Sequence, residues 1–249
     1  MLLAVDIGNT NTVLALFEGE RLVRSWRMQT GAGSYDVTEE NISDVIVSSV
    51  VPDEDKKLQE FCRENFSVEP IFVDASHTGL EVDLDRPEEI GADRLVNAVA
   101  VVCNYSAPAI VVDFGTATTF DVIDADGHYK GGVIAPGVNL SVSALERAAA
   151  KLPKVDIKKP LQVIGKNTEE AIQSGIYWGY VGLIEGLITK ITEEIGVKPF
   201  VLATGGLAPL FAPAIELIEK VDEELTLRGL LRIYQAQKQN KQQNKEEAA

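Results

Sequence analysis

The sequence of 249 residues is poor in cysteine and histidine, with two of each. Cys62 and Cys103 are too few for a disulfide-stabilised secreted scaffold, so we expect two reduced thiols in a cytoplasmic protein. His77 and His128 stand apart without the spacing of metal ligands, and we interpret them as surface residues. Zinc motifs, a P-loop and a nucleophile elbow are all lacking, so these three kinds of site are not predicted.

Long apolar runs and positive charge are also lacking. Asp6 interrupts the N-terminal apolar stretch, so no signal peptide is predicted, and no uninterrupted apolar segment is long enough to span a bilayer. The net charge of −15 argues against nucleic acid or an anionic membrane as a partner. An anionic small substrate is still compatible with this charge, because backbone N–H groups and a bound cation supply local positive potential.

One motif is present twice. The segment DIGNTNT begins at Asp6, and DFGTATT begins at Asp113. When the two segments are aligned without gaps, Asp6 matches Asp113 and Thr12 matches Thr119. Each copy follows an apolar run and leads into a second one, which ends in a polar turn with a glycine. The chain therefore carries the unit strand, acidic-glycine turn, strand, hairpin, strand in duplicate.

The duplication predicts an α/β fold of two halves, each a mixed sheet with flanking helices, and a nucleotide cleft between them. We assign 1–106 to the first half and 107–234 to the second, and we expect the polar tail 235–249 to be disordered. The connection from Met28 to Asp44 is short for a parallel crossover, so we expect it to be irregular. Hydrophobic spacing and caps predict helices at 53–66, 92–105, 138–152 and 167–196, and from Leu225 onward.

The first acidic-glycine turn has the chemistry of a phosphate loop. Asp6 could hold Mg²⁺ directly or through water, and Gly8 allows close approach of the backbone. The following polar residues offer donors to phosphate oxygens: Asn9, Thr10, Asn11 and Thr12. The alternative is a plain β-turn in which Asp6 acts as a cap. The second copy favours the functional interpretation.

The second turn offers the same chemistry. Asp113 could bind a cation, while Thr116 and Thr118 could reach phosphate, and we interpret Asp121 as structural. The ATGG segment at 203–206 follows a predicted strand, which suits either a bound nucleotide or a tight turn.

The GADR segment at 91–94 opens a predicted buried helix with adjacent charges. Asp93 could be a general base and Arg94 an anion clamp, because a guanidinium matches a carboxylate bidentately. Phosphoryl transfer to an alcohol needs both functions. The alternative is that Asp93 interacts with the helix dipole and Arg94 forms a surface ion pair. The glycine-rich segment 131–137 either lines a pocket or turns tightly.

Together these motifs resemble the type III pantothenate kinase family, within the superfamily of acetate and sugar kinases, heat-shock ATPases and actin. The resemblance rests on ordered segments that extend to about Leu231: DIGNTNT, SSVVP (48–52), GADR, DFGTATT, GGVIAPG, KLP (151–153), GKNTEEAIQSG (165–175), TGG (204–206) and TLRG (226–229).

This resemblance implies two ribonuclease-H-like (actin-like) halves and ATP-dependent phosphorylation of pantothenate to 4'-phosphopantothenate, the first step of coenzyme A biosynthesis. Implied ATP-binding residues are Asp6, Ile7, Gly8, Asn9, Thr10, Asn11, Thr12, Val13 and Thr116. Implied pantothenate-binding residues are Gly91, Ala92, Asp93, Arg94 and Thr168. Asp93 would also be the proton acceptor for in-line transfer. Asp6 would position Mg²⁺, through water, and Asp113 would bind a monovalent cation, K⁺ or NH₄⁺. Family members are typically homodimers, which would let Thr168 act at the neighbouring subunit's site.

Two departures and two alternatives accompany this resemblance. The family usually has a full helix in the crossover that is short here, and the polar tail is longer than expected. A non-catalytic nucleotide-binding regulator of the same fold is one alternative, but the intact Asp93 and Arg94 and the negative charge argue against it. The other is a phosphatase or sugar kinase of the superfamily.

Overall fold

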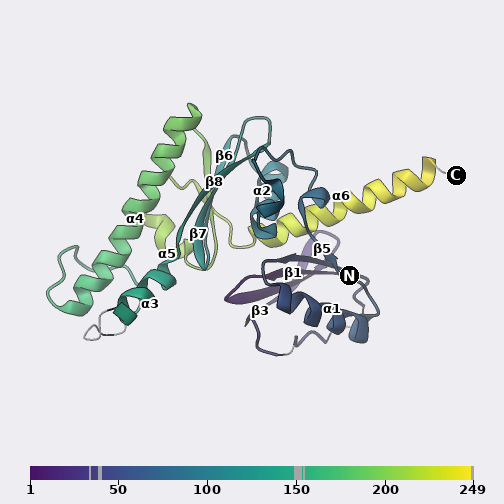
Figure 1. The fold of residues 1–249 in the computed structure, drawn as a ribbon, viewed down its shortest axis with the longest axis horizontal. Helices are drawn as coiled ribbons and strands as arrows, with labels where there is room; N and C mark the ends of the chain where they lie inside the picture. The colour runs from purple at the N-terminus through teal and green to yellow at the C-terminus, as the bar shows by residue number, and fades with distance from the viewer. Residues whose placement is uncertain (34, 39–40, 149–152, 154, 248–249) are drawn as a thin grey trace. The chain divides into compact units, whose positions relative to one another are not determined.

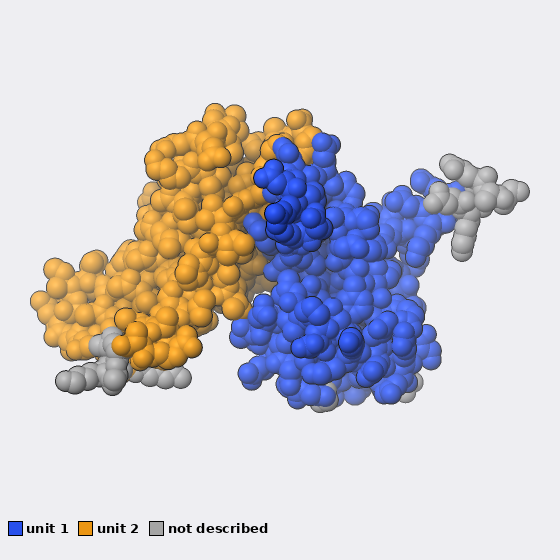
Figure 2. Space-filling view, viewed as in Figure 1, with its two compact units in different colours: residues 1–105, 224–249 blue, residues 106–223 orange. Residues whose placement is uncertain are grey.

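The computed structural model of the chain describes residues 1–33, 35–38, 41–148, 153 and 155–247. The chain forms two compact units, coloured separately in Figure 2. Unit 1 comprises Met1–Tyr105 and Glu224–Ala249, and unit 2 comprises Ser106–Glu223. Each unit contains one five-stranded mixed sheet with flanking helices (Figure 1), which confirms the predicted α/β class.

The sheet of unit 1 has the strand order β3-β2-β1-β4-β5. β1 and β2 pair antiparallel, as do β2 and β3, whereas β4 and β5 run parallel to β1. The bounds are β1 (Leu2–Ile7), β2 (Asn11–Glu18), β3 (Arg21–Gln29), β4 (Asp44–Ser49) and β5 (Ile71–Phe72).

Alternation along β1 distributes its side chains between two cores. Leu3, Val5 and Ile7 join a cluster with Leu58 and Cys62 of helix α1 (Pro52–Phe66). Leu2 and Ala4 face the other way, into a cluster with helices α2 (Ala92–Asn104) and α6 (Leu225–Glu247). Asp6 shares the face of Leu2 and Ala4, because successive strand residues point to opposite sides.

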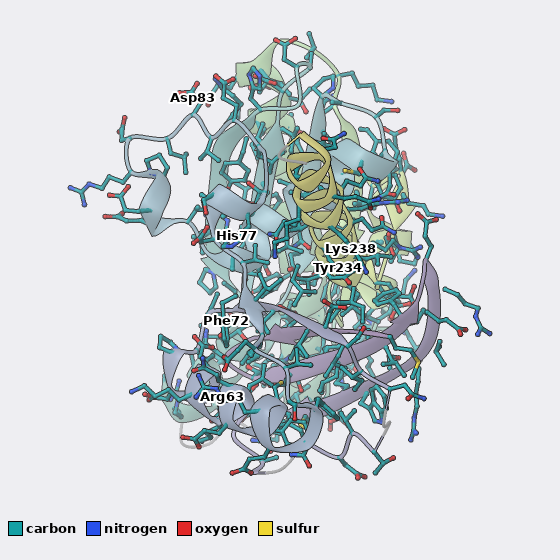
Figure 3. All side chains as sticks on the ribbon, turned by 90° about the vertical axis from the view of Figure 1, so that its right-hand side faces the viewer. Arg63, Phe72, His77, Asp83, Tyr234 and Lys238 are labelled. Atoms are coloured by element: carbon teal, nitrogen blue, oxygen red, sulfur yellow. The ribbon has the colours of Figure 1, made fainter. Side chains whose placement is uncertain are left out.

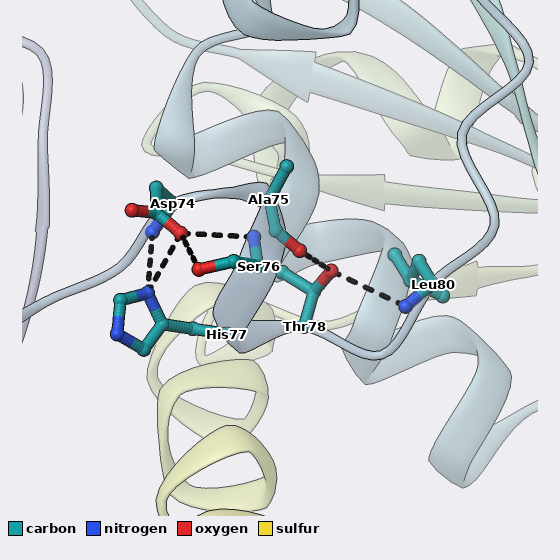
Figure 4. A network of polar contacts seen from close by, with 6 residues as sticks. All are labelled: Asp74, Ala75, Ser76, His77, Thr78 and Leu80. Carbon is teal, nitrogen blue, oxygen red and sulfur yellow. Dashed lines mark hydrogen bonds and ion pairs between the residues drawn. The ribbon is translucent and has the colours of Figure 1, made fainter.

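Short 3₁₀ turns link β5 to α2, namely η1 (Ala75–His77) and η2 (Pro87–Glu89). Asp74 caps η1: its Oδ1 accepts from Ser76 N at 2.8 Å and contacts His77 Nδ1 at 2.8 Å (Figure 4). His77 is therefore engaged in a capping box with Asp74, so it is not isolated, although it remains partly exposed as the surface interpretation expected.

The sheet of unit 2 has the order β10-β9-β6-β7-β8. Its strands are β6 (Ala109–Phe114), β7 (Ala117–Ile123), β8 (Tyr129–Pro136), β9 (Phe200–Thr204) and β10 (Lys220–Val221). Its helices are α3 (Val138–Ala148), α4 (Thr168–Ile195), α5 (Ala208–Phe211) and η3 (Ala212–Ala214). Phe114 of β6 and Tyr177 of α4 both stack on Phe211, so aromatic packing joins the sheet to two helices.

The internal duplication is confirmed strand by strand, but one pair of the alignment is wrong. Ile7 lies opposite Thr12, whereas Phe114 lies opposite Thr118. The first turn is thus one residue longer than the second, and Thr12 corresponds to Thr118 instead of Thr119. Both of these threonines are buried, at 2% and 1% exposure, as that equivalence requires.

The C-terminal segment requires a correction to the predicted domain limits. We assigned 107–234 to one half and expected 235–249 to be disordered, yet α6 belongs to unit 1 and is helical to Glu247. Leu227, Leu230 and Leu231 bury their side chains in the unit 1 core. Beyond them, Lys238 Nζ donates to Tyr234 Oη at 3.1 Å (Figure 3). The tail contains no Gly or Pro, and its residues all tolerate a helix. It therefore has no residue that would end α6 before Glu247.

The other predicted helices are found within one residue of their expected bounds where the structure describes them; residues 149–152 of the expected 138–152 helix lie outside the described part. Asn167 caps α4, accepting from Glu170 N at 2.9 Å, and Gly196 ends it in the left-handed region. In the crossover, the described residues 30–33, 35–38 and 41–43 form no helix, and Val37 and Ile42 anchor it in the core. None of the described helices is long and apolar enough to cross a membrane.

We predict that Gly229→Ala destabilises unit 1. A Cβ at this position would clash with the Val96 carbonyl oxygen, because α6 and α2 approach there with no room for a side chain. Overpacking of this kind costs about 1–3 kcal/mol of unfolding free energy, measured by urea denaturation. The exposed Gln239→Ala on the same helix is the control and should change stability by less than about 0.5 kcal/mol. Equal effects of the two substitutions would contradict the packing argument.

Candidate functional site

The first acidic-glycine turn is held by a chain of hydrogen bonds. Gly8 N donates to Asn11 O at 3.0 Å and closes the turn. Thr30, which follows β3, donates from Oγ1 to Gly8 O at 2.7 Å and lies 3.0 Å from Thr12 Oγ1. Thr30 N also donates to Thr10 O at 3.1 Å. Thr12 therefore supports the loop from inside in this structure.

The remaining residues of this turn differ in exposure. Asn9, Thr10 and Asn11 are exposed, whereas Ile7 is buried and Val13 half-buried. Among the predicted phosphate donors, Asn9, Thr10 and Asn11 are thus exposed to a ligand, whereas the Gly8 backbone N–H already donates to Asn11 O within the turn. The structure gives Ile7 and Val13 packing contacts in the two cores.

Asp6 ends β1 beside a second carboxylate. Burial, and after it the negative charge of Asp93, raises the pKa of Asp6 to about 7, while Ser48 and Arg27 lower it. Ser48 is the register partner of Asp6 on β4. Its hydroxyl is buried and makes no hydrogen bond of good geometry within the described residues, although it is close enough to act on Asp6.

Asp93 lies in the first turn of α2, where helix N–H groups favour a negative charge. Its Oδ1 accepts from Arg94 N at 2.9 Å. Burial raises the pKa of Asp93, and the Arg94 backbone N–H and guanidinium oppose that rise. Gly91 is needed beside it, because a Cβ there would lie 2.5 Å from Asp93 Oδ1. The predicted GADR segment is thus built around the Asp93 carboxylate.

The second turn is shaped by glycines. Gly205, at φ +88°, follows β9, and a Cβ on it would lie 2.5 Å from Asp113 Oδ1. Gly137 precedes α3, and a Cβ there would clash with the Thr116 carbonyl oxygen. The TGG and GGVIAPG segments therefore pack directly against the DFGTATT turn. Thr116 is exposed at the tip of that turn.

Two residues of the second turn point inward. Thr118 Oγ1 is buried and has no hydrogen-bond partner among the described residues. Asp121 is buried, and its Oδ1 accepts from Tyr129 Oη at 2.7 Å. Thr118 thus faces inward at the position equivalent to Thr12, but within the described part of the chain it makes no contact like the one from Thr12 to Thr30. Asp121 holds the hairpin, as the structural interpretation expected.

Thr168 begins α4 and is exposed. Gly165 precedes it, and a Cβ there would clash with the backbone of Glu170 and Ala171. Lys166 N donates to Glu170 Oε2 at 2.7 Å, so the GKNTEEAIQSG segment forms a capped helix start. Of the KLP segment, Lys151 and Leu152 lie outside the described residues.

The structure therefore gathers the predicted site residues in two groups. Unit 1 holds the first turn with Asp6, together with GADR. Unit 2 holds Asp113, Thr116 and Thr168. Within unit 1, burial raises the pKa of both Asp6 and Asp93, and the charge of Asp93 raises that of Asp6 further. Two close carboxylates with raised pKa values fit a bound cation, which would balance their charge.

Sequence reasoning did not assign roles to Ser48, Thr30 or Arg27. Ser48 and Thr204 occupy equivalent register positions opposite Asp6 and Asp113, and both are buried. In the sequence, each of these hydroxyl residues ends a predicted strand that should lie parallel to the strand of the acid. That shared position is the signal by which Ser48 and Thr204 could have been found. Thr30 and Arg27 become visible only through the pairing of β3 with β2.

A small acidic group lies in the hairpin turn between β7 and β8. Ligand atoms of Asp124, Asp126 and His128 lie within 4.8 Å of one another. Asp124 Oδ1 accepts from the backbone N–H of both other residues, at 3.0 and 2.9 Å. His128 is thus not isolated, contrary to the sequence-based interpretation, and this contact network accounts for the turn without a metal.

Comparison with known proteins decides the family. The family model described as type III pantothenate kinase matches residues 2–190. A type III pantothenate kinase of Paramagnetospirillum magneticum is 53% identical, over 94% of this chain and 96% of the relative. Another, of Rhodospirillum rubrum, is 49% identical, over 94% and 98%.

This chain belongs to the type III pantothenate kinase family. The resemblance found in the motifs is thereby confirmed, together with the kinase class. The type III pantothenate kinase family and its ATP-binding fold imply ATP and a divalent metal ion.

Solved structures agree on the fold. A Baf family transcriptional activator of Campylobacter jejuni superposes with a TM-score of 0.67 at 19% identity, covering 95% of this chain and 99% of that one. MreB 5 of Spiroplasma citri, bound to AMPPNP, superposes with a TM-score of 0.55 at 10% identity, covering 98% of each chain. These neighbours place the chain among the actin-like folds.

We predict that Asp6→Asn removes a pH-dependent loss of stability. The pKa of Asp6 rises from 3.8 to about 7 on folding, so the folded state binds more protons than the unfolded state between these values, and stability falls as pH rises through this window. Without Mg²⁺ or nucleotide, the variant should be more stable than wild type at pH 8 by about 2–4 kcal/mol and similar at pH 4.

Urea denaturation at several pH values measures this difference. Asp85→Asn, at an exposed carboxylate, is the control and should leave the pH profile of the wild type unchanged. A pH profile for Asp6→Asn that is parallel to the wild-type profile would show that Asp6 is not desolvated.

Proposed function

We propose that this chain transfers the terminal phosphoryl group of ATP to the primary hydroxyl of pantothenate, yielding 4'-phosphopantothenate and ADP in coenzyme A biosynthesis. The observation that carries the proposal is the placement of Asp93 at the start of α2, next to Asp6 at the end of β1, in a chain of this family. A base beside a phosphate-binding turn is what phosphoryl transfer to an alcohol requires.

Asp93 is the proposed proton acceptor. Its raised pKa makes it a stronger base than an exposed carboxylate, and its bond from Arg94 N fixes the carboxylate position. As the hydroxyl oxygen attacks the γ-phosphorus, the bond from that phosphorus to the oxygen bridging to the β-phosphate breaks, and the hydroxyl proton passes to Asp93.

Pantothenate is held in this proposal by the same segment. Gly91 and Ala92 are the proposed neighbours of the substrate beside Asp93, and the Arg94 guanidinium is suited to an anionic group of the substrate. Thr168, exposed at the start of α4, offers a hydroxyl donor near helix N–H groups.

ATP is held in this proposal by the turn from Asp6 to Val13 and by Thr116. The exposed side chains of Asn9, Thr10 and Asn11 can donate to phosphate oxygens, and Gly8 leaves room for close approach. Ile7, Thr12 and Val13 hold the turn in shape. Asp6 would hold Mg²⁺, directly or through water. When bound, Mg²⁺ neutralises charge on the β- and γ-phosphates.

Asp113 is the proposed site of a monovalent cation, K⁺ or NH₄⁺. Its carboxylate lies against Gly205, which has no side chain. A cation could therefore approach the carboxylate from the side of β9. Its equivalence with Asp6 in the duplicated motif supports a cation role, because both end the central strand of their sheet.

The active form is proposed to be a homodimer in which Thr168 serves the neighbouring subunit's site. Unit 2 exposes apolar side chains just before α4, with Leu161, Val163 and Ile164 at 104%, 64% and 74% exposure. Along α4, four exposed glycines recur on one face and leave room for close helix packing: Gly175, Gly179, Gly182 and Gly186. We place this enzyme in the cytoplasm, which suits the free Cys62 and Cys103.

Asp93→Asn should lower kcat by about 10²–10⁴-fold, because the amide cannot accept the proton. A coupled assay of ADP release with Mg²⁺ and K⁺, with and without pantothenate, measures this. ATP binding should persist, and Asp85→Asn should behave as wild type. Turnover that survives in Asp93→Asn would reject this base, and a folded wild type that binds ATP but never turns over would favour the regulator.

Mixing two inactive variants tests the shared site. In a homodimer whose sites combine Asp93 of one subunit with Thr168 of the other, hybrids of Asp93→Asn and Thr168→Val contain one intact site. Half of the randomly mixed dimers are hybrids, so activity should return to about a quarter of the wild-type level. Sedimentation confirms the dimer. Hybrids that form without recovering activity would place Thr168 in the site of its own subunit.

A further inference from the structure

Arg27 lies in a row of residues that crosses the sheet of unit 1. In the strand register, Ser48 pairs with Asp6, Asp6 with Val13, and Val13 with Arg27. Residues paired in this way lie on the same face of a sheet. The row is therefore on the face that carries Ala4 and Ala15, where α2 and Asp93 also lie.

Arg27 is close enough to Asp6 for their charges to interact. Two strand spacings separate them, roughly 10 Å between backbones, and a long arginine side chain can cover most of this distance over the short Val13 side chain. The Arg27 charge acts on the Asp6 carboxylate in the structure. Within the described part of the chain, the exposed Arg27 guanidinium forms no ion pair.

Arg27 is also fixed relative to the first turn. β3 ends at Gln29, and the next residue, Thr30, bonds to the turn through Thr10 O, Gly8 O and the Thr12 hydroxyl. Any movement of the turn would therefore be shared by the end of β3. The Arg27 backbone is therefore fixed two residues before the end of β3, so the side chain starts from a position that is set relative to the turn.

The charges of the site call for such a cation. Asp6 and Asp93 are both carboxylates, and a nucleotide triphosphate adds further negative charge. Arg94 interacts with Asp93, so its charge is already directed to the acceptor side. Arg27 is the arginine whose charge acts on Asp6. A planar guanidinium binds phosphate oxygens bidentately, which a point charge does not.

We propose that Arg27 contacts a non-bridging oxygen of the terminal phosphate of ATP and stabilises it during transfer. This inference rests on the proposed function for the placement of ATP at the turn from Asp6 to Val13, and it does not depend on the identity of the acceptor. Arg27 is then a substrate-contacting residue that neither the duplicated motif nor GADR contains.

The test compares Arg27→Met with Arg24→Met. Arg24 is on the same strand but on the other face, with its guanidinium 4.8 Å from the centre of the Trp26 ring. Calorimetry with MgATP and MgADP should show a loss of about 10–100-fold in ATP affinity for Arg27→Met and a change of less than about threefold for ADP. Arg24→Met should bind both nucleotides as wild type does.

Kinetics provide the second measurement. Arg27→Met should lower kcat/KM for ATP by about 100-fold with the pantothenate KM unchanged, and Arg27→Lys should recover part of the loss. Equal losses for ATP and ADP, or no loss, would overturn the proposal. If Arg27→Met does not fold, Arg27→Gln is measured in its place, and a failure of both to fold would assign Arg27 a structural role and overturn it too.

The two proposals fail separately. One outcome is that the wild-type protein discriminates ATP from ADP through Arg27 but never phosphorylates pantothenate. This result would contradict the proposed acceptor and support the Arg27 contact. Pantothenate-dependent turnover that is unchanged in Arg27→Met would keep the function and reject the contact.

Discussion

Burial of two carboxylates, Asp6 and Asp93, is the constraint on which the site in unit 1 depends, and the charge of Asp93 adds to the effect of burial on Asp6. Each raises the free energy of the folded protein when it is ionised, and together they require cations. The structure meets this requirement locally with Arg94, Arg27 and the N–H groups of α2. A bound cation would meet the rest. The site is therefore unfavourable when empty and most stable when occupied, which couples ligand binding to stability.

Close backbone approach is the second constraint, and glycine meets it at each junction. Gly205 lets β9 turn against Asp113, Gly137 lets α3 begin against Thr116, and Gly229 lets α6 lie on α2. In all three cases a Cβ would strike backbone or the site carboxylate, and backbone cannot move aside as a side chain can. These glycines therefore fix the geometry of the turns more firmly than the hydrogen bonds alone.

Much of the fold could be predicted because the signals were local. Alternation defined the strands, Gly19 and Gly127 marked the hairpins, and Asn167 and Gly196 bounded the longest helix. The prediction was wrong where long-range packing decided the outcome. Nothing near Leu227 in the sequence says that α6 joins the core of unit 1, and the polar tail has a composition that fits a helix as well as a disordered end. The one-residue difference between the two turns could not be seen by an alignment without gaps.

By itself, the sequence determined the duplicated acidic-glycine turns, the α/β class, the GADR segment and the membership of the pantothenate kinase family, because each is written in contiguous residues. Only the tertiary structure decided that Thr12 and Thr118 face inward, that Ser48 and Thr204 flank the two acids, and that Arg27 acts on Asp6. These relations depend on strand register and on which face of a sheet a residue occupies. Register is set by the pairing of distant segments, so no single stretch of sequence contains it.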